Sequence, residues 1–223
     1  MIPAGSHAPG VVRGLPMFPL ATVLLPGSLL PLGLFEDRYL RMVEDLLDGD
    51  REFGVVLIRR GHEVGGGEEC YEVGTRARIL EANRVPDGRW SVVALGLQRL
   101  RVEAWLPDHP YPVADIRAWP DDRHAGPPAG AIDDLRRRVA CLLDGHRRLG
   151  DPVPSADSVN GWVLADDPAL ATFQLAGQAP LGTFDRQRLL EAQTAAGRAA
   201  RLSRLVDEAQ EVVELRLAEG RGV

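Results

Sequence analysis

The sequence predicts an α+β protein, in which a β-rich N-terminal half is followed by an α-helical C-terminal half. Three observations support this prediction. Short apolar runs of alternating polarity, separated by turns that contain proline or glycine, fill residues 15–119 and are typical of consecutive β-strands. Residues 120–130 hold three prolines and two glycines without an apolar period, which marks a boundary. Beyond residue 131 the apolar residues recur at the spacing of amphipathic helices.

These patterns divide the chain into an N-terminal arm at residues 1–14, a barrel-like β domain at 15–119, a linker at 120–130 and a helical bundle at 131–220. The linker should be the most protease-sensitive interior segment, because proline- and glycine-rich loop tips lack packed partners. We expect trypsin to cut it at Arg123.

The stretch from Leu15 to Phe35 carries no charge and is long enough for a membrane span. Prolines are spread through it, and each interior proline removes a helical hydrogen bond that hydrocarbon cannot replace. A secretion signal is also disfavoured, because Arg13 is the only arginine before the run. We therefore expect buried β structure at the start of a soluble domain, with short strands at "VLL" and "LLPL" and a type II turn at Pro26-Gly27.

A helix and a strand are expected next. Glu36 or Asp37 can cap a helix whose apolar residues recur at helical spacing, and Gly49 is a natural stop. The run Glu52–Ile58, "EFGVVLI", is short, apolar and branched, which is typical of a buried strand.

The clearest β region extends from residue 73 to residue 119. It predicts strands at Val73–Arg84, Trp90–Leu97, 99–105 and Pro112–Trp119, with a turn at Pro86–Gly88. In the first of these strands, alternation places Ala77, Ile79 and Glu81 on one face. Many short strands with one helix among them indicate a small barrel or a curled sheet.

The C-terminal half predicts helices at residues 131–150, 155–168, 167–180, 183–194 and 195–220. Thr183 is the expected N-cap of the fourth helix, and Asp185 lies in its first turn. The last helix is long, with an apolar stripe from Leu202 to Leu217 and interleaved arginines and acids on its other face.

The basic residues exclude several enzyme classes. All 26 are arginine, because the sequence contains no lysine. A Walker A phosphate site, a Schiff-base enzyme and a Ser–Lys dyad each need a lysine. We therefore predict that the protein is not an ATPase or a peptidase of these types.

Other catalytic and metal-binding patterns are missing from the sequence as well. The serines lie in no nucleophile-elbow motif. The pair Asp121–Asp122 lies in the predicted linker, while Asp133–Asp134 and Asp166–Asp167 are expected at helix starts, where aspartate is a capping residue. Cys70 and Cys141 form neither a metal-ligand spacing nor a disulfide framework. We expect a reducing cytoplasm, no catalytic residue, no metal and no cofactor.

Three segments together resemble one known family: "PMFPLATVLLPGSLLPLGLFEDRYLRMVEDLL", "YEVGTRARILEANRVPDGRWSVVALGLQRLRVEAW" and "YPVADI". They are similar to the N-terminal substrate-binding domain of Lon proteases, closely over residues 15–119 and more loosely through the helices. The resemblance implies a PUA-like β-pseudobarrel with one inserted helix, followed by a helical bundle, and a role in engaging unfolded or tagged proteins. The chain ends after the first helical region, so it resembles a stand-alone Lon substrate-binding-domain protein.

We therefore predict a non-catalytic peptide-binding module, acting as an adaptor or regulator in protein quality control. Its expected partners are unfolded segments or peptides, with a protease or chaperone as a further candidate. Exposed sheet edges pair with extended peptides, and proline leaves backbone groups unpaired at edges. The candidate binding residues are Leu24, Leu25, Pro26, Leu29 and Leu30. The alternative for each of these leucines is a place in the barrel core.

The alternative function is nucleic-acid binding, because PUA-like barrels sometimes bind RNA. It rests on fold analogy alone. The net charge of −6 and the aromatic content of 5% disfavour it, since RNA recognition needs basic surface and stacking side chains.

Overall fold

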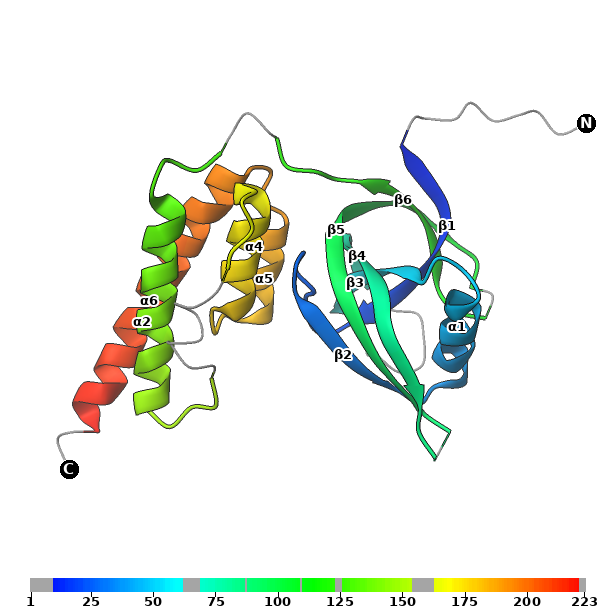
Figure 1. Cartoon of the computed structure of the whole chain (residues 1–223), viewed down its shortest axis with the longest axis horizontal. Helices are drawn as coiled ribbons and strands as arrows, with labels where there is room; N and C mark the ends of the chain where they lie inside the picture. The colour runs from blue at the N-terminus through cyan, green and yellow to red at the C-terminus, as the bar shows by residue number, and fades with distance from the viewer. Residues whose placement is uncertain are drawn as a thin grey trace, which may run out of the picture. The chain divides into compact units, whose positions relative to one another are not determined.

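A computed structural model describes residues 10–61, 69–86, 88–108, 110–122, 126–153 and 163–220. The chain forms two compact units, Met1–Pro120 and Asp121–Val223 (Figure 1). The expected trypsin site at Arg123, the middle of the expected turn at Pro86–Gly88 and most of the expected helix at 155–168 lie outside the described residues.

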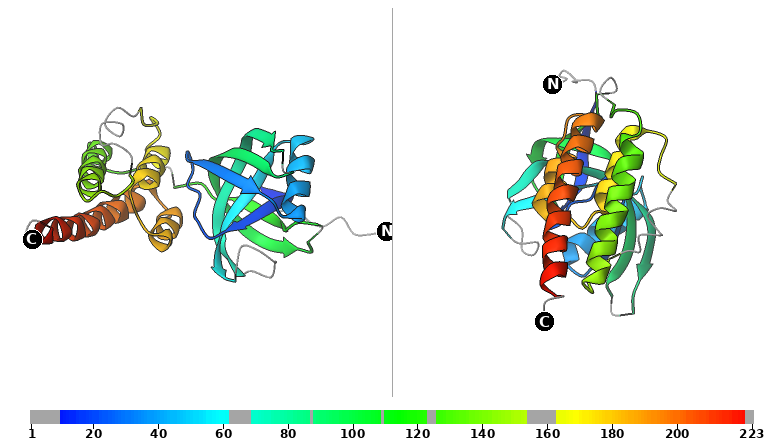
Figure 2. Two further views of the ribbon diagram at one scale, coloured as in Figure 1. Left: turned by 90° about the horizontal axis from the view of Figure 1, so that it is seen from below. Right: turned by 90° about the vertical axis from the view of Figure 1, so that its left-hand side faces the viewer.

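The N-terminal unit is a curled sheet of six strands in the order β2-β5-β4-β3-β1-β6 (Figures 1 and 2). A further pairing between β5 and β6 closes the strands from β5 to β6 into a ring, which makes the unit a pseudobarrel. The elements are β1 (Val11–Leu20), β2 (Leu29–Leu34), α1 (Asp37–Leu47), β3 (Glu52–Arg60), β4 (Glu69–Arg84), β5 (Trp90–Leu106) and β6 (Val113–Ala118). This architecture confirms the predicted fold class.

β2 lies outside the closed ring. It pairs with the first part of β5 in antiparallel register, from Leu29 opposite Leu95 to Leu34 opposite Trp90. β1 divides its pairing between two neighbours, since its N-terminal part pairs with β6 and its C-terminal part, from Met17 to Leu20, pairs in parallel with β3. The barrel therefore has a gap between the C-terminal part of β1 and β2.

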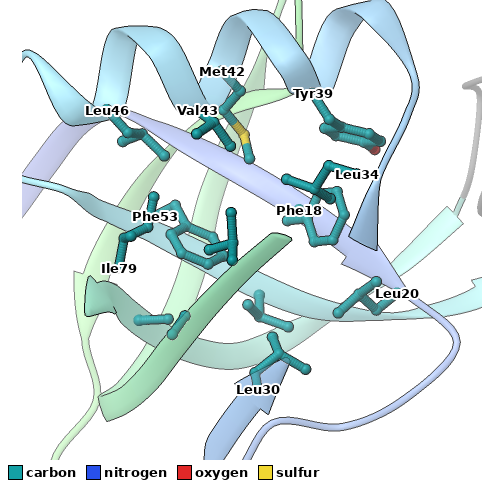
Figure 3. Packing of buried hydrophobic residues seen from close by; sticks show 14 of the residues in the cluster. Phe18, Leu20, Leu30, Leu34, Tyr39, Met42, Val43, Leu46, Phe53 and Ile79 are labelled. Atoms are coloured by element: carbon teal, nitrogen blue, oxygen red, sulfur yellow. The ribbon is translucent and has the colours of Figure 1, made fainter. Parts of the chain in front are cut away.

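The core of the β unit lies between α1 and the strands (Figure 3). Tyr39, Met42 and Val43 point from α1 into this core, where they meet Phe18 and Phe53 from the strands. The rings of Phe18 and Tyr39 pack edge to face, with centroids 4.3 Å apart. Such edge-to-face pairs add stability beyond the burial of their area, so this packing fixes α1 over the end of β1.

The type II turn predicted at Pro26-Gly27 is confirmed. The Ser28 N–H donates to the Leu25 carbonyl at 3.1 Å, and Gly27 has φ 80°, which glycine adopts without a steric penalty. The strand predicted at "VLL" is wrong, since residues 23–25 are buried but belong to no strand. Their burial comes from packing into the barrel rather than from sheet pairing.

The strands differ from the prediction at several points. β1 begins at Val11, within the stretch expected to be an N-terminal arm, because Val11 pairs with Arg117 of β6. The strands expected at Trp90–Leu97 and 99–105 are one continuous strand, β5, which pairs with β4 along most of its length. Glu81 is exposed instead of facing inward with Ile79, because the β4–β5 register shifts between these two residues.

The C-terminal unit contains α2 (Ala131–Arg148), α4 (Pro168–Gln178), α5 (Thr183–Leu190) and α6 (Ala195–Glu219). α2 and α6 lie side by side (Figures 1 and 2). Their close approach depends on Gly145, because a Cβ atom at this position would lie 2.5 Å from Cγ1 of Val213. Helices with larger residues at the contact cannot approach as closely.

Some of the aspartates and threonines expected to cap these helices do so. Asp167 accepts a hydrogen bond from the Ala169 N–H at 3.0 Å, as its expected capping role requires. Thr194 accepts from the Gly197 N–H at 2.9 Å at the start of α6. The prediction that Thr183 caps α5 is wrong, because Gly182 occupies that position and Thr183 is the first helical residue.

Arg198 is fully buried in the helical unit and is held by an ion pair with Asp121. Its Nε donates to Oγ1 of Thr172 at 2.8 Å, and its guanidinium also donates to the Ala169 carbonyl at 3.1 Å. The guanidinium lies 3.5 Å from the ring centroid of Phe173. Asp121 was expected in a linker, but this network anchors it in the helical unit.

Candidate peptide-binding groove

A groove with a volume of about 220 Å³ lies where the barrel is open between β1 and β2. Beyond Met17, whose N–H donates to the Pro112 carbonyl at 2.8 Å, the end of β1 pairs only with β3 in the described part of the chain. The lining consists of Phe18, Pro19 and Leu20 from β1, Pro31 to Leu34 from β2, and Phe35, Glu36 and Tyr39 at the start of α1. Two strand edges and one helix end therefore form its walls.

Prolines explain why this part of the barrel stays open. Pro19 lies in β1 and Pro31 in β2, and neither has an N–H to donate to a neighbouring strand. Proline in a sheet is confined to edges and bulges for this reason. The two strands cannot form a full ladder across the groove, and a bound peptide could not form one either, so apolar burial must supply most of any binding energy there.

Two large apolar side chains are exposed near the groove. Phe35 lines it and is 60% exposed, and Leu29 at the start of β2 is 62% exposed. Single exposed apolar residues are common on protein surfaces. An exposed phenylalanine on the wall of an apolar groove is more specific, because aromatic residues are enriched where proteins bind partners.

A charged pair lies at the helix end of the groove. Arg38 Nε donates to Oε2 of Glu36 at 3.1 Å, and the Arg38 guanidinium lies 4.5 Å from the Tyr39 ring centroid. Glu36 occupies the N-cap position of α1 but makes no side-chain cap, because its carboxylate faces Arg38 instead. The groove is thus apolar along its strands and polar at one end.

The structure separates the five residues that the sequence suggested for peptide binding. Leu24, Leu25, Pro26 and Leu30 are buried, and only Leu29 is exposed. The Leu24 carbonyl accepts a hydrogen bond from Oγ1 of the buried Thr75 at 2.6 Å. Contact between a peptide and these four buried residues would need a rearrangement of the core. The binding role of the five residues stays a prediction, and Leu29 is the one whose side chain is exposed.

Close packing holds this segment in place. A Cβ atom on Gly96 would lie 2.6 Å from the Leu25 carbonyl oxygen, and the Gly27 N–H donates to the Gly96 carbonyl at 2.8 Å. The buried leucines therefore follow the alternative expectation, a place in the barrel core.

None of the five predicted residues lines the groove, and the sequence analysis missed its lining residues, such as Phe18, Pro19 and Phe35. A signal for Phe35 was present, since it lies between the buried Leu34 and the helix start, where the alternation of β2 places its side chain outward. No local signal marks Phe18 or Pro19, because their place in the groove depends on where β2 lies.

The described residues contain no group of three histidine, cysteine, aspartate or glutamate side chains arranged to hold a metal ion. No helix among them has the length and apolar character needed to cross a bilayer.

Comparison with known proteins agrees with this architecture. Residues 14–208 match the family model of the ATP-dependent protease La (LON) substrate-binding domain. Lon protease 2 of Herpetosiphon aurantiacus is 30% identical over 204 residues, which cover 90% of this chain and 24% of that protein. Lon protease 2 of Sorangium cellulosum is 30% identical over 208 residues, which cover 90% and 25%. The chain thus spans about a quarter of the length of these relatives.

Two solved structures share the fold. The Lon N-terminal domain protein from Xanthomonas campestris superposes with a TM-score of 0.61 at 28% identity, covering 86% of this chain and 97% of that one. The N-terminal domain of Mycobacterium avium complex Lon protease gives a TM-score of 0.61 at 16% identity, covering 87% and 98%. Since the family model extends over most of the sequence, we conclude that the chain belongs to the Lon substrate-binding domain family.

Proposed function

We propose that the β unit binds apolar, extended segments of unfolded proteins in the groove between β1 and β2, as a non-catalytic recognition module. The observation that carries this proposal is the open barrel itself, in which two strand edges flank an apolar groove with the exposed Phe35 on its wall. Apolar pockets beside strand edges take the side chains of extended peptides, and here the pocket supplies most of the expected contact.

The size of the groove limits the affinity. A volume of about 220 Å³ accommodates a large apolar side chain of a peptide, but not a folded partner. Burying one such side chain contributes about 1.5–3 kcal/mol, and ordering the peptide offsets part of this gain. We therefore expect dissociation constants on the order of micromolar or weaker. Weak binding suits a module that must accept many sequences and release them.

The proposed setting is protein quality control, where the module would act as an adaptor or regulator. Its curated relatives are Lon proteases, and cooperation with a protease or chaperone is part of the proposal. The proposed compartment is a reducing cytoplasm, in which thiols such as those of Cys70 and Cys141 stay free.

The test is a charge placed in the groove. Phe35→Asp puts a carboxylate on the apolar wall while changing a side chain that is already exposed, so the fold should survive. Leu80→Asp is the matched control, since Leu80 is 47% exposed on β4 and does not line the groove. Binding of a fluorescein-labelled apolar unstructured peptide is measured by anisotropy, and folding is checked by circular dichroism.

We expect Phe35→Asp to weaken peptide binding at least about tenfold, because a desolvated carboxylate opposes apolar contact. Leu80→Asp should bind as the natural sequence does. Equal binding by all three folded proteins would exclude this groove as the peptide site. Leu29→Asp then tests how far along β2 the binding surface extends.

A further inference from the structure

A second cavity, with a volume of about 500 Å³, lies within the helical unit between α5 and α6. Its lining is dominated by charged side chains: Arg188 and Asp185 from α5, and Arg201, Arg204 and Glu208 from α6, with Leu205 as the apolar member. We call this cavity the arginine cleft. It belongs to a different unit from the peptide groove, and its chemistry is also different.

The arginines of the cleft lack the ion pairs that other arginines of the helical unit have. Arg136 and Arg137 of α2 each bind an aspartate one turn earlier at 3.0 Å. In contrast, no carboxylate oxygen of the described chain lies within 4.0 Å of a guanidinium nitrogen of Arg188, Arg201 or Arg204. The spacing of Arg204 and Glu208 on α6 would allow an i,i+4 pair, but none forms.

One internal contact holds the cluster together. Nη1 of the half-buried Arg201 donates to the Arg188 carbonyl at 3.3 Å, which links α6 to the end of α5. This contact uses one of the five N–H donors of the guanidinium. The remaining donors of three arginines therefore share one cavity, where like charges repel and an anion would relieve the repulsion.

The chemistry of the cleft selects among anions. A guanidinium presents a planar fork that matches a carboxylate with two parallel hydrogen bonds. Three arginines against two carboxylates give the lining a net charge of +1, and the whole chain has a net charge of −6. A nucleic acid carries a charge at every nucleotide, and Asp185 and Glu208 would repel it. A peptide with a few carboxylates fits this balance better.

We propose that the arginine cleft binds a carboxylate-bearing segment of an acidic peptide, so that the helical unit has a recognition site of its own. The fork donors of Arg188 and Arg204 bind the carboxylates, and Leu205 contacts the aliphatic part of the segment. This site goes beyond the apolar groove, because it selects for charge where the groove selects for apolar side chains.

The test uses fluorescein-labelled hexaglutamate as the probe and hexaglutamine as its uncharged match. Arg188→Glu and Arg204→Glu reverse single exposed charges in the cleft of the full chain. Arg137→Glu is the control, because it is an exposed arginine of α2 with the same change in net charge. Circular dichroism establishes that all three variants are folded.

We expect each cleft reversal to weaken hexaglutamate binding about tenfold, since hydrogen bonds to charged groups are among the stronger ones. Arg137→Glu should change binding less than about twofold. Hexaglutamine should not bind. Phe35→Asp should leave hexaglutamate binding unchanged, which separates this site from the groove.

Several results would overturn the proposal. If Arg137→Glu weakens hexaglutamate binding as much as the cleft variants do, the attraction is a general effect of the protein's charge and not a specific site. If hexaglutamine binds as well as hexaglutamate, the cleft does not recognise carboxylates. No binding of hexaglutamate at about 1 mM would remove the site altogether. Tighter binding of a labelled oligothymidylate, lost in the same two cleft variants, would reassign the cleft to nucleic acid.

Discussion

The β unit buries Glu52 beside arginines that keep access to water, whereas in the helical unit Arg198 has no exposed surface. Glu52 of β3 is buried between Arg76 and Arg78 of β4, but the Arg78 side chain is 53% exposed and keeps much of its water. Arg198 has no exposed surface and depends on Asp121, Thr172 and the Ala169 carbonyl. The cost of removing a partner should therefore differ between the two units.

The comparison also teaches how each unit leaves a surface for binding. The β unit is held by an apolar core under α1, and core residues such as Phe18, Leu20 and Leu34 also form the floor and walls of the β1–β2 groove. The helical unit satisfies Arg198 internally and leaves Arg188, Arg201 and Arg204 in the cleft. An arginine therefore has a structural role where a carboxylate of the chain pairs with it. Where no carboxylate pairs with it, its guanidinium can bind a ligand.

The largest expected effect is in the helical unit. Asp121→Ala should lower the free energy of unfolding by about 3–5 kcal/mol, because it leaves the buried Arg198 without its counter-ion. Urea denaturation followed by circular dichroism measures the change. Asp166→Ala, an exposed aspartate that precedes α4, is the control and should change stability by less than about 0.5 kcal/mol. A loss below about 1 kcal/mol for Asp121→Ala would show that water reaches the Arg198 guanidinium in the variant and replaces the lost carboxylate.

The second-largest loss of stability is expected at the contact between α2 and α6. Gly145→Val places side-chain atoms where Val213 already lies, so we expect a loss of about 2 kcal/mol from overpacking. Thermal unfolding reports it. The double variant with Val213→Ala should lose less than the sum of the single variants, because the second change makes room for the first. Additive losses would mean that Gly145 is needed for some other reason than this contact.

Glu52→Gln should have a smaller effect than Asp121→Ala. The substitution keeps the shape of the side chain and removes its charge, while Arg76 and Arg78 retain access to water. We expect a loss of about 1 kcal/mol in chemical denaturation. A loss as large as that of Asp121→Ala would break the comparison between the two units.

The smallest effect concerns pH and the end of α2. Oδ2 of Asp151 lies 2.7 Å from Nδ1 of His146 and 3.5 Å from Nη1 of Arg216. The hydrogen bond with His146, aided by the charge of Arg216, lowers the pKa of Asp151 from its ordinary value of 3.8. A lowered pKa contributes stability that is complete above the ordinary value and is lost as the pH falls through the folded-state value.

Asp151→Asn should therefore melt slightly below the natural sequence near neutral pH, and the difference should shrink as the pH falls below 3.8, the ordinary pKa of the carboxyl group. Melting temperatures across this pH range provide the measurement. Asp144→Asn, an exposed aspartate of α2, should show no such convergence. A difference that persists in acid would assign the role of Asp151 to packing instead of charge.

The sequence by itself determined the elements whose signals are local. The type II turn at Pro26-Gly27 follows from two adjacent residues, and α2 and α6 follow from apolar periods that lie within each helix. The order of strands before helices gave the fold class for the same reason. Neighbouring residues set these features through their own backbone preferences, so no distant partner was needed to predict them.

Only the tertiary structure decided which parts of these elements face the core. Leu29 and Leu30 point to opposite faces of β2, as adjacent strand residues do, but which of them is buried depends on the pairing of β2 with a strand more than sixty positions away. Asp121 belongs to the helical unit rather than to a linker because its partner Arg198 lies 77 positions away. The groove and the arginine cleft likewise depend on how separate elements pack. A local sequence pattern does not determine contacts between residues that are far apart in the chain.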